Sequence, residues 1–309
     1  MTQTLTAPTT RAHARREQQR RRSAAPPPRP RRRSASEPIV TFSAQTVMIF
    51  WTALVFIPLL WTLMSSFKTS REILESPFGL PARWSWDNYV NAWTQAGIGQ
   101  FFANTVIVVA GALVATMLLG AMCAYALARF DFPGRRFIRN LILAGLTFPV
   151  FLAVVPLFFV VQNFGLLNSH LGLIVTYTAY ALPFTIFFLA AFFEQLPEEI
   201  AEAAAIDGAS QWRTFFSVML PMAAPGMSAI ALLNFVGLWN QYLLPLVLIS
   251  DPSKSVLTQG MQTFAVQAGF NVDFGALFAA AVMTVVPVLI VYLLFQKKLL
   301  SSVSQGALK

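Results

Sequence analysis

Six long apolar runs dominate the sequence. They cover residues 43–66, 101–128, 141–162, 171–193, 222–249 and 274–296. About 20 apolar residues in a helix cross the roughly 30 Å hydrocarbon core of a bilayer, so each run is long enough to span it. Charged residues make up only 11% of the chain, whereas soluble domains carry about 25%. We therefore expect an all-α, polytopic membrane protein with six transmembrane helices.

The basic residues between these runs predict the orientation of the chain. Lys and Arg in short connections are retained on the cytoplasmic side. With the N-terminus inside, that side holds 18 of the 22 Lys and Arg residues, and the outer side holds only Lys68, Arg71, Arg83 and Lys254. We therefore expect both termini in the cytoplasm. The first run has no small-residue cleavage signal after it, so it should remain as an anchor.

Residues 1–38 are rich in Arg, Pro, Ala and Ser and have almost no apolar content. Such a composition cannot bury enough surface to offset the entropy of ordering. We expect a disordered cytoplasmic tail before a transmembrane domain over residues 39–309. Its arginines fit anionic lipid headgroups and topology setting better than nucleic acid, so no nucleic-acid partner is expected.

A polar segment over residues 194–221 separates the fourth and fifth runs and faces the cytoplasm in this orientation. Its alanines favour a slim helix from Pro197 to Asp207, about 16 Å long at 1.5 Å per residue. Gly208 permits the left-handed conformation that ends a helix. Ser210 can cap a second helix that stops at Pro221. The segment therefore predicts a helix-turn-helix at the inner face, shaped to enter a groove on a partner.

The chain lacks the residues that would let it use energy or do chemistry by itself. The six runs contain no Asp, Glu, Lys, Arg or His, whereas proton-coupled transporters place ionisable residues in the membrane. There is no GxxxxGK[ST] phosphate loop. His170 and Cys123 have no ligand clusters nearby, so we expect no metal, no cofactor and no catalytic residue. A stand-alone secondary transporter is the less favoured alternative.

The order Glu202-Ala203-Ala204, Gly208 and then Leu220-Pro221 resembles the EAA loop of ABC importer permeases. Further segments are similar to carbohydrate-type permeases of the MalG kind: WDNYVNAW, AYALARFDFPGRR, GLLNSHLGLIVTYTAYALPF and LLNFVGLWNQYLLPLVL. The resemblance implies the type I importer architecture in a bacterial cell membrane. It also implies three kinds of protein partner: a second permease, two copies of a cytoplasmic ATPase and an extracellular sugar-binding protein.

By position, the resemblance assigns the ATPase-coupling role to Glu202, Ala203, Ala204, Asp207, Gly208, Leu220 and Pro221. A substrate path is a separate hypothesis, built on polar and aromatic residues of the fifth run: Asn234, Trp239, Asn240, Gln241 and Tyr242. These groups can bond sugar hydroxyls or stack on a pyranose, but they can equally hold helices together. A sugar or oligosaccharide is the expected solute, with glycerol phosphate as the alternative because its importers have similar subunits.

Overall fold

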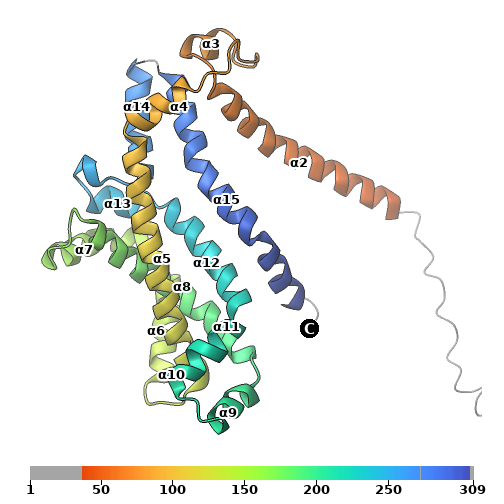
Figure 1. Cartoon of the computed structure of the whole chain (residues 1–309), viewed down its shortest axis with the longest axis vertical. Coiled ribbons are helices and arrows are strands. Elements are labelled where there is room, and N and C mark those ends of the chain that lie inside the picture. The colour runs from red at the N-terminus through yellow and green to blue at the C-terminus, as the bar shows by residue number, and fades with distance from the viewer. Residues whose placement is uncertain (1–36, 272, 307–309) are drawn as a thin grey trace, which may run out of the picture. The chain divides into compact units, whose positions relative to one another are not determined.

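The computed structural model describes residues 37–271 and 273–306, and every regular element in that part of the chain is helical. This confirms the all-α prediction (Figure 1). The part of the chain that the structure describes divides between residues 57 and 58 into two compact units, and the second unit carries the sites below. Helix α2 (Glu37–Ser65) begins within the predicted tail. The rest of that tail lies outside the described residues, so its disorder stays a prediction.

Four helices are long and apolar enough to cross a membrane, within the described ranges. They are α2, α5 (Ile98–Arg129), α8 (His170–Gln195) and α15 (Phe274–Gly306). They coincide with four of the six predicted spans. Two bent helix pairs raise the number to six at most, if each pair counts as one span. The count of six and the cytoplasmic termini therefore remain predictions.

The run at 141–162 was predicted to be one transmembrane helix, but the structure divides it into two helices. Helices α6 (Arg135–Thr147) and α7 (Val150–Asn163) are bent by 108° at the break between them. Phe148 there is extended, with ψ of 122°, because a residue before proline is disfavoured in the α conformation. Pro149 has no N–H with which to continue the helix. The Phe148-Pro149 pair thus divides the run.

The run at 222–249 is also divided, into α12 (Ala224–Trp239) and α13 (Leu243–Leu248). In an unbroken helix the carbonyl of Gln241 would need the N–H that Pro245 lacks. Here that carbonyl instead accepts a hydrogen bond of 2.8 Å from the hydroxyl of Thr258. The Gln241 carbonyl is therefore hydrogen-bonded to a residue of α14 (Leu257–Asn271) and not to an amide of a longer α12.

The packing of the second unit is centred on α5 and α8, which form its most extensive helix pair. They approach closely where Gly120 faces Thr185: a Cβ at position 120 would lie 2.6 Å from the Thr185 Cγ2 atom. Two apolar clusters lie along the pair. One includes Leu173, Tyr177 and Trp239, and the other includes Phe193 and residues of the polar segment.

The connections at the other end of α5 from the polar segment are also ordered (Figure 1). They contain α3 (Ser70–Glu75), α4 (Asp87–Thr94) and the short helix η2 (Pro252–Lys254). Asn168, at φ 55°, accepts bonds from the amides of Ser250 and Asp251. His170 is the first residue of α8, and its Nε2 atom lies 3.2 Å from the Lys254 carbonyl oxygen.

Candidate functional site

The polar segment forms a short exposed helix, α9 (Glu198–Ile206), at the end of the molecule that also carries α10 (Gln211–Thr214) (Figure 1). Pro197 precedes its first turn, and Glu198 and Glu199 lie in that turn. Carboxylates there complement the positive end of the helix dipole. The predicted helix is confirmed.

Gly208 ends α9 as predicted. Its φ is +78°, a conformation that glycine adopts at no steric cost. The amide of Gly208 donates to the carbonyl of Ala205 at 3.0 Å, and the amide of Ala209 donates to that of Ala204 at 2.9 Å. This pair of bonds is a Schellman motif, which satisfies carbonyls that a helix end otherwise leaves free. The turn is therefore fixed by backbone bonding within the segment.

The second helix of the segment starts as predicted and ends differently. The Ser210 hydroxyl accepts a bond of 3.3 Å from the Arg213 amide and so caps α10. A π-helical turn, η1 (Phe215–Met219), follows, and then α11 (Leu220–Met222). The helix does not stop at Pro221: the chain continues to Met222 and bends by 76° into α12. Pro221 has no backbone N–H, so the regular pattern of helical backbone hydrogen bonds is interrupted there even though the chain continues as a helix.

Most coupling candidates are accessible on the surface of this chain. Glu202, Ala203, Asp207, Gly208 and Pro221 are exposed, and Ala204 and Leu220 are half-buried. The opposite side of α9 packs through Ile200 and Ala201 against the apolar cluster around Phe193. The helix thus has one anchored face and one free face.

Apolar side chains accompany the free face. Ile206, the last residue of α9, is 86% exposed. Trp212 on α10 and Phe216 on η1 are also exposed and stack on each other, with ring centroids 6.1 Å apart. Exposed apolar groups beside polar ones are typical of a protein–protein contact surface. The segment can therefore bind a partner through both shape and apolar area.

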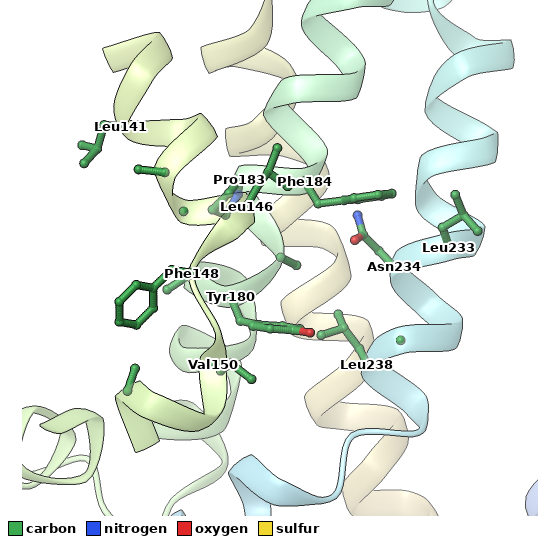
Figure 2. Close-up of a pocket in the computed structure, with 16 residues that line it drawn as sticks. Leu141, Leu146, Phe148, Val150, Tyr180, Pro183, Phe184, Leu233, Asn234 and Leu238 are labelled. Atoms are coloured by element: carbon green, nitrogen blue, oxygen red, sulfur yellow. The ribbon is translucent and has the colours of Figure 1, made fainter. Parts of the chain in front are cut away.

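A second candidate site is a pocket of about 730 Å³ between the α6–α7 break, α8 and α12 (Figure 2). Its walls are mostly apolar and include Phe148, Phe184 and Leu238. The polar side chains among its lining residues are those of Tyr180 and Asn234. Figure 2 shows the Tyr180 hydroxyl directed toward Leu238 across the pocket. The lining carries no charged side chain.

The structure separates the predicted path residues. Asn234 lines the pocket, and its Nδ2 atom donates a bond of 2.7 Å to the Thr185 hydroxyl on α8. Trp239 is buried in the core and donates to the Thr284 carbonyl on α15 at 3.2 Å. Asn240, Gln241 and Tyr242 were predicted within a helix but lie in the break after α12. Asn234 and Trp239 thus both hold helices together, and only Asn234 of the five reaches the pocket.

Sequence reasoning missed the aromatic residues of the pocket. Tyr180 and Phe184 lie close together on α8, whereas Phe148 lies in the break between α6 and α7, and the three rings line one pocket because α6 and α7 are bent relative to each other. The signal that was available is the Phe148-Pro149 pair inside an apolar run, since proline biases the preceding residue away from helix.

Comparisons with known proteins place the chain beside transport proteins. The family model described as binding-protein-dependent transport system inner membrane component matches residues 116–304. The diacetylchitobiose uptake system permease protein of Streptomyces coelicolor is 61% identical over 86% of this chain and 88% of its own length. The trehalose/maltose transport system permease protein of Thermococcus litoralis is 31% identical over 82% and 91%.

A solved structure shares the fold. A chain from a bacterial ABC transporter involved in the import of the acidic polysaccharide alginate superposes with a TM-score of 0.76. The match covers 85% of this chain and 98% of that chain, at 23% identity. The likeness establishes the helical architecture of this chain.

Proposed function

Because the chain belongs to the family of binding-protein-dependent transport system inner membrane components, we propose that it is one permease subunit of an ATP-driven oligosaccharide importer. The observation that carries this proposal is the exposed helix α9. Glu202 and Ala203 are exposed on this helix, and Gly208 forms the turn that ends it. Such a helix serves as a contact for a cytoplasmic ATPase. The chain is a transport subunit, and ATP is hydrolysed by a separate protein.

The assembly contains four further subunits of three kinds. They are a second permease of similar fold, two copies of the cytoplasmic ATPase and an extracellular solute-binding protein. The family description itself names dependence on a binding protein and a place in the inner membrane. In this arrangement α9 receives the movement of the ATPase. The polar segment is directly followed by α12, which carries that movement to the pocket.

The proposed solute is a neutral, N-acetylated disaccharide. The 61% identical relative is named for uptake of diacetylchitobiose, which is such a sugar. The pocket supports this class because its lining carries no charged side chain. An importer of glycerol phosphate would need basic groups near a phosphate ester, since a desolvated anion must be paired.

Within the pocket, Tyr180 and Asn234 would contact the sugar. Tyr180 is 46% exposed and presents an aromatic ring together with a hydroxyl. The Oδ1 atom of Asn234 accepts no hydrogen bond from any residue in the described ranges, while Nδ2 is held by Thr185. The amide oxygen is therefore fixed in orientation and open to a sugar hydroxyl. Two polar groups give a weak site, as a transit site requires, because a tightly bound solute would leave slowly.

The test uses the complete importer in lipid vesicles. The ATPase and ATP are inside the vesicles, and the binding protein with labelled sugar is outside. N,N′-diacetylchitobiose should accumulate only with ATP, and glycerol phosphate should not accumulate. Tyr180→Ala should lower uptake of the disaccharide, and Tyr242→Ala, outside the pocket, is the matched control. Accumulation that persists without the ATPase would instead support a stand-alone carrier. Equal uptake by the Tyr180 and Tyr242 variants would remove the pocket from the path.

A further inference from the structure

Arg129, the last residue of α5, is the most enclosed charged group at the α9 end of the second unit. Its side chain is only 8% exposed. A buried guanidinium must be compensated by hydrogen bonds or an opposite charge. The contacts of the Arg129 side chain therefore show which segments the C-terminal end of α5 binds.

The contacts of Arg129 converge on the junction between α8 and α9. Its Nη2 atom donates to the Phe193 carbonyl at 2.7 Å and to the Leu196 carbonyl. Both carbonyls belong to the C-terminal end of α8, where the helix dipole favours a cation. The chain then needs only Pro197 to reach α9. Arg129 thus caps one helix at the hinge from which the next one starts.

The same guanidinium faces the first residue of α9. Its Nη1 atom lies 3.7 Å from Oε1 of Glu198, which is too long for a hydrogen bond. The Nε atom of Arg129 is buried and has no hydrogen-bond partner among the residues that the structure describes. The Glu198 side chain itself is 82% exposed. A small rotation of α9 would bring the Glu198 carboxylate within hydrogen-bond distance of Nη1, in a charge-assisted contact that arginine and carboxylate favour.

From these contacts we infer that Arg129 is a positioning residue for the coupling helix. It sets the angle of α9 relative to α8, and its pair with Glu198 closes when the ATPase drives α9 into its second position. A push on α9 then reaches α5 directly, in addition to the helices joined to α9 along the chain. Because α5 packs along α8 over much of its length, both helices move together. This inference rests on the proposed coupling function and adds the route by which force leaves α9.

Glu198→Gln is the primary test, because it removes one charge from an exposed side chain and leaves the cap on α8 intact. Glu199→Gln is its matched control: the residue is exposed, lies in the same first turn, and forms no ion pair with any residue in the described ranges. Each variant is assembled into the complete importer in vesicles. The readout is sugar taken up per ATP hydrolysed, which a change in the amount of folded protein does not alter.

Glu198→Gln should lower this ratio about two- to five-fold, the range that a partly exposed ion pair allows, and Glu199→Gln should leave it unchanged. Arg129→Gln should lower it further, and adding Glu198→Gln to Arg129→Gln should cause no additional loss, because both act through one contact. Equal ratios for the Glu198 and Glu199 variants would overturn the inference, as would losses that multiply in the double variant. A wild-type complex with no ATP-dependent uptake would instead refute the proposed function.

Discussion

Gly208 is the position where the shape of the coupling segment depends most directly on one residue. A Cβ built there would meet nothing within 4 Å, yet the backbone has φ of +78°. The penalty for a side chain is therefore conformational and not steric within this chain. A left-handed backbone costs an ordinary L-residue roughly 1–2 kcal/mol. Gly208→Ala should thus lower the ratio of the Schellman turn to other loop conformations by about 5- to 30-fold.

The assay compares Gly208→Asn, Gly208→Ala and Gly208→Val in the complete importer, by ATP hydrolysis stimulated with the sugar-loaded binding protein. Asn tolerates the left-handed region and β-branched Val does not, so activity should fall in the order Asn, Ala, Val. Gly165→Ala is the control, since it has the same kind of backbone, with φ of +67° and open space around it, in a different connection. It should leave coupling intact. An Asn variant as damaged as Val would refute the conformational explanation and point to a contact with the ATPase.

Four further substitutions test other parts of the molecule. Ile206→Ser removes an 86% exposed side chain, so it should leave thermal stability unchanged but weaken co-purification of the ATPase by about tenfold or more. Gly120→Ala places a methyl 2.6 Å from Thr185 Cγ2 and should lower the free energy of unfolding by about 1–3 kcal/mol. Gly237→Ala in an open helical position should raise it by up to about 1 kcal/mol, and equal melting temperatures would contradict both. Asn168→Ala removes the acceptor of two amides in the segment before η2 and should speed proteolysis there, while unchanged cleavage would count against this role.

Much of the architecture followed from patterns that act locally along the chain. Long apolar runs without charge predict membrane helices, and four of these runs form single helices as expected. The residues that cap the helices of the polar segment could also be predicted from the sequence. Ser210 and Gly208 fix the backbone through bonds to residues no more than a few positions away. Such features are decided by near neighbours, so the sequence alone contains them.

The features that sequence reasoning missed depend on contacts between distant residues. The break after Trp239 is stable because Thr258 satisfies the carbonyl of Gln241, and no local pattern predicts that bond. Asn234 was expected either to line a sugar path or to hold helices together, and only the structure shows that its amide nitrogen is bonded to Thr185 on α8. Arg129 entered the sequence analysis only as one of the 18 basic residues on the predicted cytoplasmic side. Its burial and its carbonyl partners follow from how the ends of α5 and α8 meet.

The most direct test of force transfer through α9 is solute accumulation by vesicles that contain both permease subunits, with and without the ATPase. With the ATPase, enclosed ATP and the loaded binding protein, the disaccharide should rise inside well above its external concentration, and Gly208→Val should abolish this rise. Without the ATPase the same vesicles should only equilibrate or remain empty. A solute gradient built by the two permeases alone would contradict the central claim that this chain is driven by a separate ATPase through its coupling helix.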